Sequence, residues 1–215
     1  MARAATKIIA LAQGKGGVAK STTAINLACE ATHSGESAAI LDMDEKQQSS
    51  KLWSKRRKGS SPEVSVVNVY GLKRELDRLR EKGVGWVFID LPGRDAPVSS
   101  AGIIAADFVL IPTRPTTIDF EASVPTAGAC FGAGKSYAYL LSSVQPQGGK
   151  SIGRQFRAAL EMLPKPPPVC PILIGQRVAI PRSTDAGKSV REMDLDKEAT
   201  KEFEDLFKWL KRVVR

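Results

Sequence analysis

The chain has 215 residues, of which 42% are hydrophobic, so it can bury the core of one α/β domain spanning residues 1–215. Its 32 basic and 23 acidic residues give a formal net charge of +9. This excess favours a polyanionic partner, with nucleic acid preferred over an anionic membrane. A solvated basic surface without a partner would explain the same excess. One histidine and three scattered cysteines provide no zinc site, histidine triad or disulfide framework, and no apolar stretch approaches the roughly 18 residues of a membrane span.

Strand-like and helix-like segments alternate along the chain. Apolar runs typical of strands buried on both faces lie at 7–13, 37–42, 64–69, 84–90, 107–112, 137–144 and 169–175. Helical patterns lie at 20–33, 71–82, 98–105, 118–130, 151–163 and 196–213. Repeated β-α units of this kind predict an α/β fold with a doubly wound, mostly parallel sheet and helices on both faces, and ligands then bind at the carboxyl ends of the strands.

A glycine-rich loop follows the first strand and precedes the first helix. It reads Gly14, Lys15, Gly16, Gly17, Val18, Ala19, Lys20, Ser21, Thr22. A strand, a glycine turn and a helix in this order predict the phosphate-binding loop of a P-loop NTPase, because backbone N–H groups and the helix N-terminus converge on the anion. Lys20 is then expected to reach the terminal phosphates and the Ser21 hydroxyl to bind Mg²⁺. The alternative is an ordinary glycine turn.

Carboxylates follow two further strands. Asp42 and Asp44 end the second strand, and their spacing by one residue places both on the same face if the strand persists. Asp90 ends the apolar strand that begins at Trp86. At the carboxyl ends of strands beside a phosphate loop, such acids can face Mg²⁺ and the attacking water, although many buried strands simply end in an aspartate.

The loop departs from the strict P-loop pattern, which has glycine where this chain has Ala19, and it carries a second lysine, Lys15. This variant, Lys-Gly-Gly-x-x-Lys-Ser/Thr, resembles the ParA/MinD family of deviant Walker A ATPases, most closely the small plasmid-partition ParA proteins. The acids fit the same resemblance, although Glu45 and Lys46 stand where the family has Pro-Gln.

The resemblance implies a slow, Mg²⁺-dependent and partner-stimulated ATPase that forms a homodimer around ATP. Lys15 would reach the partner's nucleotide, Asp44 would position the attacking water, and Asp42 and Asp90 would join Ser21 in organising the metal. The segments at 109–122 and 176–192 would shape the dimer face and the base pocket. A small centromere-binding partner of the ParB/ParG kind, non-specific DNA and a cytoplasmic, nucleoid-associated location are also implied.

The last predicted helix, 196–213, is amphipathic and basic. By resemblance to partition ATPases, the residues expected to contact DNA are Lys188, Arg191, Lys208, Lys211, Arg212 and Arg215. Two other interpretations stay open: a MinD-like amphipathic helix on an anionic membrane, and a helix packed on the sheet with a solvated basic edge. DNA is favoured over membrane because no extra tail follows this helix. The basic run 55–58 is expected in an exposed loop or helix.

Overall fold

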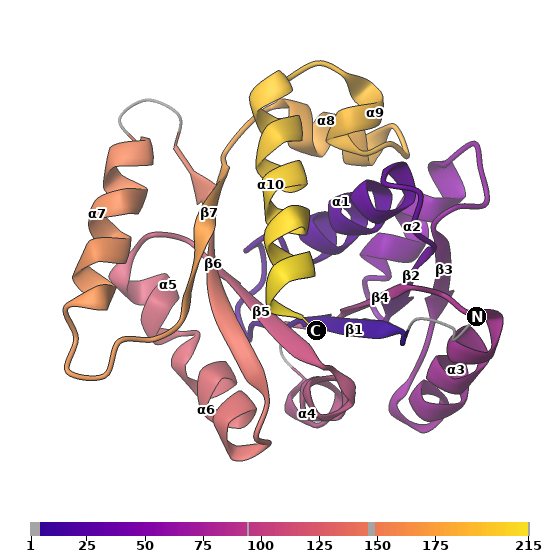
Figure 1. Cartoon of the computed structure of the whole chain (residues 1–215), viewed down its shortest axis with the longest axis horizontal. Helices are drawn as coiled ribbons and strands as arrows, with labels where there is room; N and C mark the ends of the chain where they lie inside the picture. The colour runs from indigo at the N-terminus through magenta and orange to yellow at the C-terminus, as the bar shows by residue number, and fades with distance from the viewer. Residues whose placement is uncertain (1–4, 94, 146–148, 215) are drawn as a thin grey trace.

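One parallel sheet organises the molecule (Figure 1). The computed structural model describes residues 5–93, 95–145 and 149–214. The sheet has seven strands in the order β3-β2-β4-β1-β5-β6-β7, and every pairing is parallel. The strands are β1 (Lys7–Leu11), β2 (Ala38–Asp42), β3 (Glu63–Val66), β4 (Trp86–Asp90), β5 (Phe108–Thr113), β6 (Ser136–Val144) and β7 (Val169–Gly175). The seven predicted strands and the doubly wound fold class are therefore confirmed.

Ten helices surround this sheet in the described part of the chain. They are α1 (Lys20–His33), α2 (Ser49–Arg56), α3 (Val69–Lys82), α4 (Ala96–Ala105), α5 (Thr117–Glu121), α6 (Val124–Gly132), α7 (Gly149–Glu161), α8 (Ala179–Asp185), α9 (Val190–Met193) and α10 (Lys197–Val213). The helix predicted at 118–130 is in fact two helices, because Pro125 starts a new one at α6. The short helices α2, α8 and α9 were not predicted.

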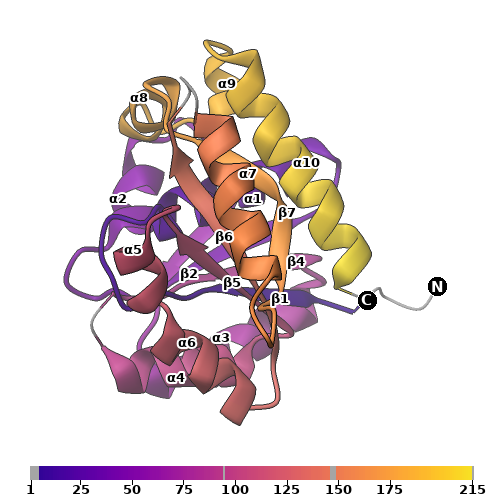
Figure 2. The same cartoon turned by 90° about the vertical axis from the view of Figure 1, so that its left-hand side faces the viewer.

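Alternating side chains of the strands build a core on each face of the sheet. Ile9 and Leu11 of β1 pack with α1, α2, α9 and α10, whereas Ile8 and Ala10 pack with α3, α4 and α6. Figure 2 shows the two helical layers on opposite sides of the strands. Burial on both faces explains why these strands read as continuous apolar runs.

Helix α10 lies against the sheet with its apolar face buried. Phe203, Leu206, Phe207 and Leu210 are at most 2% exposed, and the Phe207 ring meets the edge of Trp86 at 5.1 Å between centroids. Because this face belongs to the core, it is not available to lie on a membrane in this conformation. Among the described residues, none of the helices has the length and apolar character needed to span a bilayer.

The strand order brings the predicted functional segments together. The carboxyl end of β1 lies beside that of β4, and β4 in turn pairs with β2. In this register Leu11 is opposite Asp90, and Asp90 is opposite Asp42. The phosphate loop after β1 and the acids of β2 and β4 therefore share one edge of the sheet.

Candidate nucleotide-binding site

The loop at residues 14–19 turns directly into α1. Gly17 has φ 72°, and Ala19 has φ 70° and ψ 29°, so both occupy the left-handed region. Ala19 thus adopts the conformation for which glycine is suited at this position. Its carbonyl accepts the Thr23 N–H at 2.9 Å, which starts the helix.

Lys20, the first residue of α1, points its ammonium into the loop. The residue is 8% exposed, and its Nζ donates to the Lys15 carbonyl at 3.2 Å. Burial lowers the pKa of Lys20, and the charges of Asp90 and Asp44 act against this shift. A largely desolvated ammonium beside backbone N–H groups is well placed to receive a phosphate.

Gly93, three residues after β4, keeps this space open. A Cβ built on Gly93 would lie 3.4 Å from the Gly16 nitrogen and 3.5 Å from Lys20 Nζ, between two donors expected to contact phosphate. Any side chain here would crowd the anion. Sequence reasoning missed this role of Gly93, because the role depends on the contact between the end of β4 and the phosphate loop.

Val18 connects the phosphate loop to the sheet. It is 1% exposed, and its carbonyl accepts the Ser142 hydroxyl of β6 at 3.0 Å. Gly14 lies against the backbone of Gly93. These two predicted nucleotide-binding residues thus support the loop, whereas Lys15, Gly16, Gly17, Ala19, Lys20, Ser21 and Thr22 line the adjacent cavity.

Asp42 and Asp90 form a buried pair of carboxylates at the same edge. They are 0% and 2% exposed. Burial, followed by the neighbouring charge of Asp42, raises the pKa of Asp90 to about 7, and burial likewise raises the pKa of Asp42. Asp90 Oδ1 is buried without a hydrogen-bond partner among the described residues. An orphaned oxygen beside a second carboxylate and the Ser21 hydroxyl fits Mg²⁺, which takes one or two carboxylates together with phosphate oxygens.

Helix α2 holds both carboxylates from its first turn. The Ser50 hydroxyl donates to Asp90 Oδ2 at 2.7 Å, and the Lys51 N–H donates to Asp42 Oδ2 at 3.0 Å. Sequence reasoning missed Ser50, because nothing local marks a serine 40 residues before its acid as a partner.

Asp44 lies half-buried at the rim. Its Oδ1 accepts the N–H groups of Lys46 and Gln47 at 3.2 and 3.0 Å, which shapes the loop that departs from the family's Pro-Gln pattern. Asp44 lines the cavity.

Lys15 is half-exposed and is held within its own chain. Its ammonium forms an ion pair with Asp119 of α5, whose carboxylate also accepts the Thr116 hydroxyl at 2.8 Å. Although burial acts to raise it, Lys15 and Thr116 together hold the pKa of Asp119 below its usual range. Beside this pair, Arg114 donates to the Gly17 carbonyl at 2.8 Å. Asp119 and Arg114 belong to the segment 109–122 that was expected to shape the dimer face and the base pocket, but their contacts with Lys15 and Gly17 were not predicted.

The cavity beside these groups has a volume of about 1370 Å³, enough for a nucleoside triphosphate. It runs from the phosphate loop to the segment after β7, where Gln176, Arg177 and Val178 line it together with Ile180, Pro181 and Thr184 of α8. Of the segment 176–192, predicted to shape the dimer face and the base pocket, residues 176–178 and part of α8 therefore line the cavity, whereas residues 187–192 do not.

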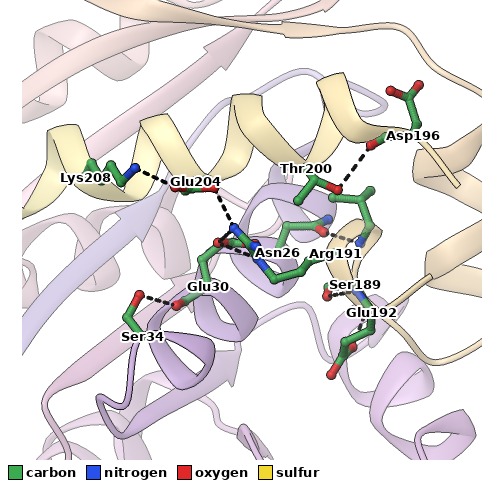
Figure 3. Close-up of polar contacts among 11 residues, drawn as sticks. Asn26, Glu30, Ser34, Ser189, Arg191, Glu192, Asp196, Thr200, Glu204 and Lys208 are labelled. Atoms are coloured by element: carbon green, nitrogen blue, oxygen red, sulfur yellow. Dashed lines mark hydrogen bonds and ion pairs between the residues drawn. The ribbon is translucent and has the colours of Figure 1, made fainter. Parts of the chain in front are cut away.

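The predicted DNA contacts do not form one free surface. Arg191 is committed to the fold, because its guanidinium holds Glu30 of α1 at 2.8 and 2.9 Å and Glu204 of α10 at 2.9 Å (Figure 3). Lys208 pairs with Glu204 and Lys211 with Glu36. Lys188 and Arg212 are exposed, and Arg215 lies outside the described residues. The DNA contact of Arg191 stays a prediction, for a residue that the fold already holds between α1 and α10.

Comparison with known proteins agrees with this geometry. A family model described as "AAA domain" matches residues 6–70. Maintenance of carboxysome distribution protein A from Gloeobacter kilaueensis is 33% identical over 155 residues, which cover 71% of this chain and 68% of that protein. Protein ParA from Rhizobium radiobacter is 34% identical over 116 residues, which cover 52% of this chain and 50% of that protein.

Among solved structures, the MinD cell division protein of Aquifex aeolicus superposes with a TM-score of 0.76 at 15% identity, covering 96% of this chain and 98% of that one. That similarity concerns the fold. The family is shown by the sequence relatives. The chain belongs to the ParA/MinD family of P-loop ATPases.

Proposed function

We propose that this protein is an ATP-driven positioning switch that dimerises around ATP, binds DNA without sequence preference, and is reset when a partner stimulates hydrolysis. The observation that carries the proposal is the position of Lys15. Its half-exposed ammonium lies at the rim of a cavity that already contains Lys20, Ser21 and the acids of β2 and β4.

Each group has a separate task in the proposed hydrolysis. Gly16 and Gly17 supply backbone donors, Lys20 meets the terminal phosphates, and Asp44 orients the attacking water. Ser21, Asp42 and Asp90 would hold Mg²⁺, which neutralises phosphate charge. Lys15 from the partner copy would add positive charge where the transition state gains negative charge. An arginine finger supplied in trans is worth about 10³–10⁵ in rate, so the single chain should be a slow ATPase.

The DNA part of the proposal rests on charge. The net charge of +9 favours a polyanion, and the buried apolar face of α10 leaves the MinD-like membrane helix without its apolar contact surface. A small ParB/ParG-like protein would be the partner that stimulates hydrolysis, and the dimer would reside on the nucleoid in the cytoplasm.

The cargo has two candidates. Plasmid or chromosome segregation is suggested by the ParA relative. Positioning of a protein assembly is suggested by the relative named for carboxysome distribution. Affinity capture with the ATP-bound protein as bait separates them, since the first predicts a small DNA-binding partner and the second an adaptor attached to a protein assembly.

Co-sedimentation tests the DNA step. With Mg·ATP the protein should pellet with random-sequence DNA and not with anionic vesicles, and log affinity should fall with log salt by about 0.9 per phosphate contact. Pelleting with vesicles alone, or DNA binding that ignores both ATP and salt, would refute this step.

A further inference from the structure

The fold gathers basic residues from two distant segments around the end of α2. Gly187, between α8 and α9, packs so closely on α2 that a Cβ there would lie 2.5 Å from the Arg56 carbonyl carbon. Trp53 Nε1 donates to the Lys188 carbonyl at 3.1 Å, and Arg57 donates to the Gly187 carbonyl at 3.3 Å. Figure 2 shows α8 next to α2. These contacts bring Lys188 to Lys55, Arg56 and Lys58; we name these four residues the α2–α9 basic surface.

The charges of this surface are not neutralised within the described chain. All four residues are exposed, and no ion pair to a described residue involves any of them. The nearby Glu192 is occupied by Arg57 at 2.5 and 2.7 Å, and Glu63 by Arg78 and Lys82. On α10, by contrast, three of the five basic residues, Lys201, Lys208 and Lys211, face carboxylates. Lys197 and Arg212 of α10 form no ion pair with a described residue.

We propose that the α2–α9 basic surface is where the protein holds the phosphate backbone of DNA. This inference rests on the proposed function and replaces α10 as the location of the contact. Gly59, Ser60 and Ser61 continue the surface and are exposed. Hydroxyl and backbone N–H groups beside lysine and arginine are the donors that commonly bind phosphate in DNA. A membrane site would need an exposed apolar face next to the charges, and residues 55–61 contain no apolar side chain.

The same helix connects this surface to the nucleotide site. The first turn of α2 binds Asp90 through Ser50 and Asp42 through the Lys51 N–H, while its last turn carries Lys55 and Arg56. Arg56 also lines the cavity. The eight residues of α2 therefore connect the two carboxylates to Lys55 and Arg56. A shift of the carboxylates on nucleotide binding would move this helix and its basic end, which gives a physical route for ATP to control DNA affinity.

Two triple variants of equal charge test the location. Lys55→Ala/Lys58→Ala/Lys188→Ala alters the α2–α9 basic surface, and Lys197→Ala/Lys201→Ala/Arg212→Ala alters α10; each removes three positive charges. Arg56 and Arg57 stay because they contact the cavity and Glu192. Fluorescence anisotropy with labelled duplex DNA and Mg·ATP gives affinity and salt slope, and a fluorescent ATP analogue reports nucleotide binding separately.

We expect the α2–α9 variant to lose at least about tenfold in DNA affinity, with a salt slope shallower by up to about 2.7, while ATP binding is unchanged. The α10 variant should bind within about threefold of the wild type. The reverse ranking, or equal losses, would overturn the location and leave DNA binding itself intact. Absence of DNA binding by the wild type would overturn both the location and the proposed DNA step, and vesicle binding lost only in the α2–α9 variant would reassign the surface to lipid.

Discussion

Ala19 adopts a left-handed backbone conformation directly before Lys20, which is proposed to contact phosphate. A residue with a Cβ loses about 1–2 kcal/mol in this region, whereas glycine does not. The conformation is retained because it starts α1 and directs the loop N–H groups toward the anion. Ala19 thus occupies a backbone conformation that suits the glycine of the strict P-loop pattern.

This backbone strain predicts how substitutions at Ala19 change the stability of the protein. Ala19→Gly is expected to leave stability unchanged or raise it by up to about 1 kcal/mol, because strain relief exceeds the extra entropy of the unfolded chain. Ala19→Val should cost more than about 1 kcal/mol and weaken ATP binding, since β-branched residues avoid positive φ. Urea unfolding and ATP titration measure both effects. A valine variant as stable as the wild type would show that the loop is not strained.

The ion pair between Lys15 and Asp119 opposes the proposed dimer, because the ammonium must leave Asp119 to reach a second nucleotide. Asp119→Asn keeps an acceptor for the Thr116 hydroxyl but removes the charge. If each of two such pairs contributes about 0.5–1 kcal/mol, the dimer dissociation constant should fall by about fivefold to thirtyfold with ATP.

Sedimentation equilibrium in Mg·ATP measures this change. Thr116→Ala is the matched control, since it removes the hydroxyl bound to Asp119 and keeps the carboxylate. Weaker dimerisation of Asp119→Asn than of the wild type would mean that Asp119 supports the dimer instead of opposing it.

At the scale of elements, Arg191 joins three helices. It extends from α9 to Glu30 of α1, which is 2% exposed, and to Glu204 of α10 (Figure 3). Arg191→Ala leaves a buried carboxylate unpaired and should cost about 3–5 kcal/mol in unfolding free energy. Glu30→Gln/Arg191→Ala should recover part of that loss, because the amide carries no charge. Urea unfolding compares them, and a loss below about 1 kcal/mol in Arg191→Ala would contradict a structural role.

The same junction predicts an acid-sensitive contribution. Hydrogen bonds from Lys208 and then Arg191 lower the pKa of Glu204 to about 2. The folded pKa lies below the unfolded one, so this stabilisation is present above about pH 4.5 and is lost as pH falls toward 2. Glu204 is exposed enough that screening limits the effect to under about 1 kcal/mol. Between pH 6 and pH 3, Glu204→Gln should therefore lose less stability than the wild type; an equal loss would exclude this contribution.

Elements differed in how well the sequence predicted them. The strands were predictable because burial on both faces makes them continuous apolar runs. Helix α2 was not, because Trp53 is its single buried large side chain and its stability comes from distant contacts, such as the bond to the Lys188 carbonyl. Pro125 is a local signal for the break between α5 and α6. The helical pattern over 118–130 nevertheless predicted one continuous helix.

For the molecule as a whole, the phosphate loop and the aspartates could be located from sequence because each follows a strand of a parallel sheet. Ser50, Gly93 and Ser142 could not, nor could the contact of Asp119 with Lys15, since each acts on a residue far along the chain. Surface charge was also ambiguous in sequence. The cations of α10 and of the basic run look alike there, and the structure shows that three of those on α10 pair with carboxylates.

The proposed switch depends on two copies of the protein that face each other across their nucleotides. Light scattering of Asp44→Ala, which should retain ATP unhydrolysed, tests this directly, with Lys15→Gln/Asp44→Ala as the matched control. We predict the mass of two chains with Mg·ATP and of one chain without it, and the mass of one chain for the double variant even though it binds ATP. ATP-loaded Asp44→Ala that stays a single chain at every protein concentration would contradict the account.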